Sequence, residues 1–186
     1  MNKARNYRIF LTGYTIAGFA SGLFNPFWVI FIQGFGGSSI ESFGFALGLV
    51  GLAQSVTTYI VGKHSDKLGR KPYLIIGGVS QAIIIVCYTF ITSIGELYTL
   101  QILLGIASAI ENTMVTALLG DLTDKSTRGA DVGRYSAVTG IFSAIAMMIG
   151  GFVVKYFGIN IIFYLVAVLF LVTSSIIFFI NEKNSV

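Results

Sequence analysis

Residues 62–72 read Gly-Lys-His-Ser-Asp-Lys-Leu-Gly-Arg-Lys-Pro and form a short basic segment between two apolar runs, residues 43–61 and 73–93. Each run has about 20 residues, the length that a helix needs to cross roughly 30 Å of hydrocarbon. The segment itself holds four of the chain's 12 Lys and Arg residues. We therefore predict two membrane-spanning helices joined by a basic loop.

The same alternation of long apolar runs and short polar connections continues over the whole chain. Six runs are long enough to span a membrane, at residues 9–32, 43–61, 73–93, 97–119, 136–154 and 159–180. They are continuously apolar rather than alternating, which excludes a β-barrel. The sequence therefore predicts an all-α membrane protein, with a single six-helix transmembrane domain over residues 1–186. The first run is too long for a signal peptide, so we expect it to remain in the mature chain.

The composition excludes a soluble globular domain and a disordered chain. Hydrophobic residues make up 55% of the 186 residues and charged residues only 11%, whereas a soluble domain carries about 25% charged residues. Eleven of the 12 Lys and Arg residues lie on one side of the predicted membrane, and only Lys155 lies on the other. Because basic loops stay in the cytoplasm, we predict cytoplasmic termini and a multi-pass protein of the plasma membrane. This topology also explains the net charge of +4 without a nucleic-acid partner.

The basic segment carries a recognisable motif. Gly62 and Gly69 allow sharp turns, Asp66 can cap a helix or pair with Arg70, and Pro72 suits the first turn of a helix. The spacing resembles the signature of the major facilitator superfamily, G-x-L-a-D-r-x-G-r-k, between its second and third helices. The matching residues are Gly62, Asp66, Gly69, Arg70 and Lys71, while His64 departs from the usual apolar residue.

A second motif after the fourth apolar run supports the same resemblance. Gly120-Asp121-Leu122-Thr123, followed by Arg128-Gly129, resembles the family's D-L-x-x-x-x-x-R-G segment. The resemblance covers the whole chain but corresponds to the amino-terminal six-helix half of a twelve-helix transporter, which consists of two inverted three-helix repeats. It implies that Asp66, Arg70 and Asp121 form a cytoplasmic gate cluster, together with Arg128.

The function that the resemblance implies is secondary-active transport of a small solute by alternating access, as a symporter or uniporter. A half-size subunit would need a second six-helix half, either another copy in a homodimer or a separate chain. Two features differ from the family's drug/proton antiporters. Gln101 replaces the Arg of the fourth-helix motif, and Ala146-Met147 replace the Gly-Pro of the fifth helix. We therefore expect neither an Arg-based proton relay nor a standard drug/proton antiporter.

Glu111 is the one ionisable residue well inside a predicted span, fifteen residues into the fourth run. A charged acid there costs a few kcal/mol, so it should face a cavity or a partner, or be protonated. Asn112 and Gln101 belong to a polar stripe beside it, at helical spacing. We predict that these three residues line a substrate or proton pathway. The alternative is that the stripe only fastens the bundle through interhelical hydrogen bonds.

The first and second runs hold further candidates for the pathway. Asn25 precedes Pro26, which removes a backbone donor and can expose a carbonyl group, although a tolerated kink without a ligand is the alternative. Gln54 is a weaker candidate, beside a ridge formed by Gly44, Gly48, Gly51 and Ser55 that we predict to pack against a neighbouring helix. We expect Gln81 to form a hydrogen bond within the bundle, and the Ser136, Gly140, Ser143 and Gly150 face to serve packing.

Other chemistry is not indicated by the sequence. The single cysteine, Cys87, allows no internal disulfide, and the single histidine, His64, is too little for a catalytic triad or a metal site. No cofactor or enzymatic activity is therefore expected. The expected partners are the lipid bilayer, a neutral or cationic solute, and protons acting through Glu111. The alternative function is a non-transporting truncated relative, or an assembly or regulatory membrane subunit.

Overall fold

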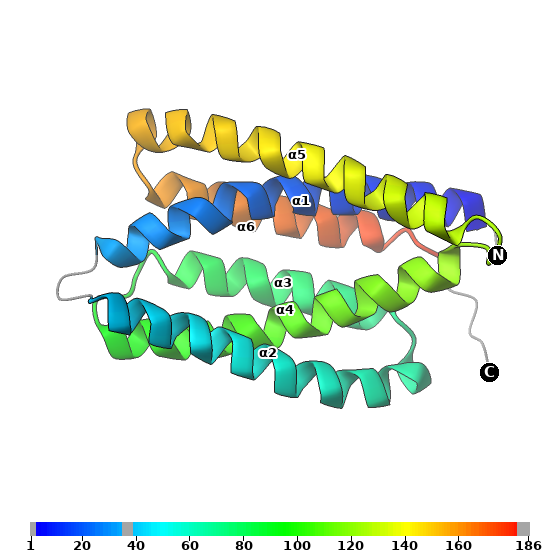
Figure 1. Ribbon diagram of the computed structural model, residues 1–186, viewed down its shortest axis with the longest axis horizontal. Coiled ribbons are helices and arrows are strands. Elements are labelled where there is room, and N and C mark those ends of the chain that lie inside the picture. Colours follow the sequence, from blue (N-terminus) through cyan, green and yellow to red (C-terminus); the bar gives the residue numbers. More distant parts are fainter. Residues whose placement is uncertain (1–2, 35–38, 182–186) are drawn as a thin grey trace.

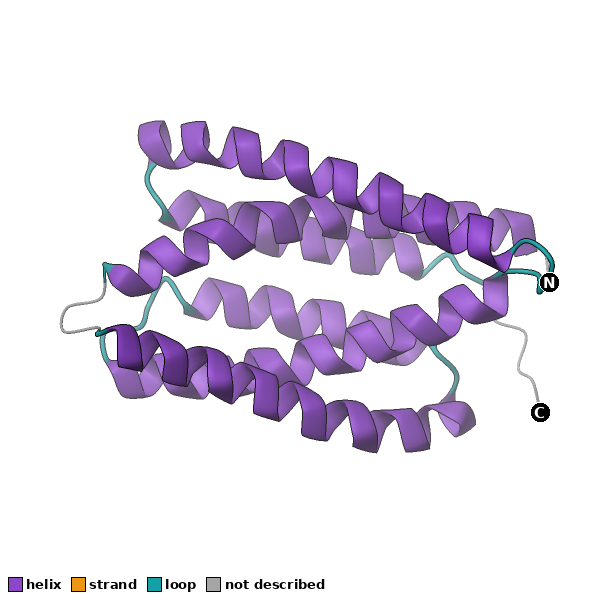
Figure 2. Ribbon diagram, viewed as in Figure 1, coloured by secondary structure: helices purple, strands orange, loops and turns teal. Residues whose placement is uncertain are grey.

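The computed structural model describes residues 3–34 and 39–181, without the side chains of residues 64–68. In this part of the chain the helices are joined by short loops, and there is no strand (Figure 2). Its six helices are α1 (Lys3–Gln33), α2 (Ile40–Leu68), α3 (Lys71–Cys87), α4 (Ile94–Leu122), α5 (Arg128–Phe157) and α6 (Asn160–Ile177). Five of them are long and apolar enough to cross a membrane, whereas α3, with 17 residues, is shorter.

Polar residues at the helix ends explain why most helices extend beyond the apolar runs. The helix α4 begins with a capping box, in which the Ser93 hydroxyl and the Glu96 carboxylate each accept a hydrogen bond from the other residue's backbone N–H. The connection between α4 and α5 covers only residues 123–127, because both helices continue into the polar segment expected as a loop. The helix α3 ends at Cys87 rather than Ser93, since the N–H groups of Thr89 and Phe90 donate to carbonyls only three residues back.

The helices pack in a regular pairwise pattern (Figure 1). The helix α1 packs against α5 and α6, while α4 packs against α2 and α3, and α3 contacts α6. Side-chain and backbone atoms of Asn6 and Asn181 exchange two hydrogen bonds, at 2.9 and 3.4 Å. The described chain therefore starts and finishes at the same end of the bundle, together with the α2–α3 and α4–α5 connections. We call this the basic end.

Glycines bring two helix pairs into close contact. A Cβ atom on Gly22 of α1 would lie 2.2 Å from the carbonyl oxygen of Ser143 in α5, and one on Gly105 of α4 would lie 2.6 Å from that of Val50 in α2. By contrast, no atom of the described residues lies within 4 Å of a Cβ on Gly44, Gly48 or Gly51. The ridge therefore does not pack against a described helix of this chain, because α4 contacts α2 along another face.

Replacing Gly22 by Ala should destabilise the bundle by about 1–3 kcal/mol, because the new methyl group meets backbone atoms that cannot rotate away. Gly140→Ala is the matched control, since a Cβ there has open space around it. We expect Gly140→Ala to unfold at the temperature of the unmodified protein or slightly above it. Thermal unfolding of both variants in one detergent tests this, and equal midpoints would contradict the close α1–α5 contact.

Candidate functional site

A partly open cavity of about 580 Å³ lies between the helices and is the candidate site. Residues of α1, α4 and α5 form most of its wall, with Gln81 and Ile85 contributed by α3, Phe170 by α6 and Val50 by α2. Its lining combines aromatic rings with amide, hydroxyl and carboxyl groups. A volume of this size falls within the range of small-molecule pockets, about 300–1,000 Å³.

Glu111 provides the acidic group of the cavity. Its side chain is only 4% exposed, and its Oε2 atom accepts a hydrogen bond from Nε2 of Gln81. The hydroxyl of Tyr14 on α1, another residue of the cavity wall, has no hydrogen-bond partner among the described residues. Among the described residues that line the cavity there is no Lys or Arg. The carboxyl group therefore has neutral neighbours in the cavity wall.

The structure brings three of the sequence candidates together. Asn25 and Asn112 line the same cavity as Glu111, and both residues are exposed. The helix α1 continues through Pro26 to Gln33, so the proline does not end it. Two asparagine amides and one carboxyl group thus face a common space from α1 and α4.

Two other candidates lie outside the lining of this cavity. Gln101 is 0% exposed, and neither of its amide atoms has a hydrogen-bond partner within the described structure. Gln54 is half-buried on α2, where its backbone nitrogen would lie 3.3 Å from a Cβ on Gly105. Both residues occupy helix contacts rather than the cavity wall.

Sequence reasoning missed several lining residues. The hydrogen bond expected for Gln81 within the bundle is confirmed, but the residue also lines the cavity. Tyr14 and Tyr135 were not singled out, and the α5 residues Ser136, Gly140 and Ser143, expected to serve packing, line the cavity as well. The helical spacing of the α5 face was the available signal. Small residues at that spacing suit both a close contact and a cavity wall, so the sequence could not separate the two.

The motif residues gather at the basic end. Arg70 Nε lies 3.4 Å from Asp121 Oδ2, which joins the α2–α3 connection to the end of α4. Gly69 has φ of 81°, which accounts for glycine at this turn, whereas Gly62 lies within α2 and makes no turn. The ammonium group of Lys71 lies 4.5 Å from the ring centre of Phe178. The side chain of Asp66 lies outside the described residues.

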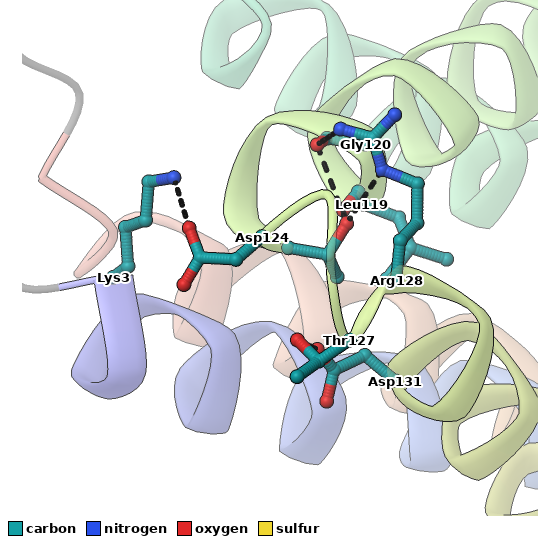
Figure 3. A network of polar contacts seen from close by, with 8 residues as sticks. Lys3, Leu119, Gly120, Asp124, Thr127, Arg128 and Asp131 are labelled. Atoms are coloured by element: carbon teal, nitrogen blue, oxygen red, sulfur yellow. Dashed lines mark hydrogen bonds and ion pairs between the residues drawn. The ribbon is translucent and has the colours of Figure 1, made fainter.

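A second polar network follows α4 at the same end (Figure 3). Arg128 donates from Nη2 to the Gly120 carbonyl at 3.1 Å and from Nε to the Thr123 hydroxyl at 3.3 Å. Lys3 of α1 pairs with Asp124 at 2.8 Å, an interaction that the sequence did not predict because 121 positions separate the two residues. Arg128 therefore links the start of α5 to the end of α4, and the ion pair of Lys3 links the α4–α5 connection to α1.

The Lys3–Asp124 pair gives the basic end a weak dependence on pH. The neighbouring ammonium group lowers the pKa of Asp124, so the stabilisation is present above the ordinary Asp pKa of about 4 and is lost as pH falls through the lowered value. We expect Lys3→Gln to lower the unfolding temperature slightly at pH 7 and low salt, and to have no effect in strongly acidic buffer. Thermal unfolding across this pH range provides the measurement. A difference that persisted in acid would contradict this interpretation.

Comparison with known proteins places the chain among membrane transporters. The family model described as "Major Facilitator Superfamily" matches residues 10–186. The uncharacterized MFS-type transporter YitZ of Bacillus subtilis is 33% identical over 152 residues, which cover 82% of this chain and 92% of the relative. The multi-drug resistance efflux pump PmrA of Streptococcus pneumoniae is 32% identical over 187 residues, covering 98% of this chain and 46% of the relative. The multidrug resistance protein MdtG of Proteus mirabilis is 31% identical over 181 residues, covering 94% and 43%.

The relatives therefore fall into two classes by length. The chain matches nearly all of the Bacillus protein but spans about half the length of the two drug-resistance proteins.

Proposed function

The chain belongs to the major facilitator superfamily, and from this membership we propose that it forms one half of a secondary-active transporter that moves a small solute by alternating access. It is a multi-pass membrane protein of a transporter family. The observation that carries the proposal is the 580 Å³ cavity, in which Glu111, Asn25 and Asn112 meet. These groups offer hydrogen bonds and a negative charge to a solute inside an otherwise apolar bundle.

The packing pattern supports the assignment to half of a twelve-helix transporter. The main contacts of α1–α3 correspond to those of α4–α6. The helix α1 packs against α5 and α6, and in the same way α4 packs against α2 and α3. This is the relation expected of two inverted three-helix repeats. A second half, either another copy or a separate chain, would complete the transport path. With the basic end in the cytoplasm, two copies would share one orientation.

The electrostatics of the cavity favour a neutral or cationic solute. Glu111 faces neutral groups, no Lys or Arg lies among the described lining residues, and the rings of Tyr14, Phe24 and Tyr135 can contact a cation through their faces. The same carboxyl group is the proposed site of proton coupling, because a carboxyl group with low exposure in a membrane tends to exchange a proton or bind a counter-charge.

Two measurements test the proposal. The mass of the purified protein in nanodiscs, corrected for lipid, reports whether a second copy is bound. Binding of tetraphenylphosphonium and tetraphenylborate, which share a shape but differ in charge sign, reports the charge preference of the cavity. We expect a dimer that binds the cation at least tenfold more tightly than the anion after subtraction of lipid partitioning. A monomer that binds neither ion and transports no neutral solute would instead favour the regulatory or non-transporting alternative.

A further inference from the structure

The helix α3 contacts Glu111 directly, although only two of its residues, Gln81 and Ile85, line the cavity. Gly77, Gln81 and Ile85 are four residues apart, so they share one face of α3. A Cβ on Gly77 would lie 3.0 Å from Cβ and 3.1 Å from the backbone nitrogen of Glu111. The missing side chain of Gly77 thus lets α3 approach α4 at the level of the acid. One turn further along, this approach places the Gln81 amide against the Glu111 carboxyl group.

The neighbouring glycine fixes α3 from its other side. A Cβ on Gly78 would lie 2.5 Å from the Ser174 hydroxyl of α6, and that hydroxyl already donates to the Phe170 carbonyl at 2.9 Å. The pair Gly77-Gly78 therefore lets α3 contact α4 and α6 at the same height. A helix held on both sides provides a fixed support for the Gln81 amide.

The hydrogen bond leaves the two oxygens of Glu111 in different situations. Oε2 accepts a hydrogen bond from Gln81, whereas Oε1 accepts none from the described residues. Glu111 lines the cavity, so Oε1 is the oxygen left available to a solute or a proton. A carboxyl group held at one oxygen presents the other in a fixed direction, which reduces the entropy that binding must overcome.

We propose that Gln81 is a positioning residue, which holds Oε2 of Glu111 from α3 and presents Oε1 to the cavity. The inference rests on the proposed function for its role in transport, but the arrangement itself can be tested without transport. Tyr14 on α1 and Tyr135 on α5 also line the cavity, but only the Gln81 amide forms a hydrogen bond with the Glu111 carboxyl group in the described structure.

Infrared difference spectroscopy of the full chain in nanodiscs tests the contact directly. The carboxyl band of Glu111 is assigned by its disappearance in Glu111→Gln. We expect this band to move to higher wavenumber in Gln81→Leu, because a carbonyl that loses a hydrogen bond vibrates faster. Gln101→Leu is the matched control, with the same substitution at a buried glutamine that has no partner in the described structure, and should leave the band in place. An unshifted band in Gln81→Leu would overturn the proposal.

A second variant separates positioning from a general loss of structure. Gly77→Ala keeps the Gln81 amide but forces α3 away from α4, so it should shift the band in the same direction by a smaller amount. Gly95→Ala, where a Cβ has open space, should not. Tetraphenylphosphonium binding should weaken about tenfold in Gln81→Leu and remain unchanged in Gln101→Leu. If neither the unmodified protein nor any variant binds tetraphenylphosphonium but the band still shifts, the proposed preference of the cavity for a cation is wrong and the positioning role of Gln81 stands.

Discussion

Replacing Glu111 by Gln should abolish solute movement driven by a pH gradient, with a decrease of at least about tenfold. The substitution keeps the size of the side chain but removes the group that can release a proton. Ethidium, a fluorescent monovalent cation, serves as the probe in proteoliposomes that contain the assembled protein. Exchange of ethidium at saturating concentration on both sides, which needs no proton movement, should continue in the variant.

The control for this experiment is another carboxyl group on a membrane helix. Glu41 lies in the first turn of α2, is exposed and is not among the cavity residues, so Glu41→Gln should transport as the unmodified protein does. Unchanged pH-driven transport in Glu111→Gln would remove Glu111 from the coupling mechanism. Loss of both the driven transport and the exchange would indicate that the acid serves solute binding alone.

Most of the fold follows from the sequence because the membrane imposes one simple requirement. Backbone groups in hydrocarbon must form hydrogen bonds within their own helix, so each run of about 20 apolar residues predicts one helix. The requirement weakens at the polar ends, where caps and turns decide. This is why the α4–α5 connection is shorter than expected and α3 ends at Cys87.

The candidate site could be predicted only in part. Glu111, Asn25 and Asn112 could be found because polar groups within a span need a reason to be there. The contribution of Gln81 depends on Gly77, since that glycine brings α3 against α4, and no pattern within one helix reveals which neighbour it meets. Gln101 shows the reverse case. It is polar like Asn112 and lies in the same stripe, but it is buried in a helix contact, and that position depends on how the helices pack.

The ion pair between Arg70 and Asp121 leads to the second large prediction. It joins the α2–α3 connection to the end of α4, and we expect it to stabilise the arrangement of the basic end that the structure shows. Arg70→Asp places two negative charges side by side and should favour an open basic end. The double variant Arg70→Asp with Asp121→Arg restores opposite charges and should restore most of the original arrangement. Lys125→Asp is the control, since it reverses an exposed charge in the α4–α5 connection.

A cysteine placed in the cavity reports the opening. Cys87 is the single cysteine, so Cys87→Ser provides a background in which Ser108→Cys, at the cavity wall, is the one reactive thiol. We expect a membrane-impermeant maleimide, added at the basic side, to label it about tenfold faster in Arg70→Asp. A shift of about 1.4 kcal/mol between closed and open states is sufficient for this change. Slow labelling in the double variant and in Lys125→Asp would show that opposite charges at positions 70 and 121 keep the basic end closed to the reagent. Fast labelling in the double variant would instead assign the effect to the other contacts of Arg70.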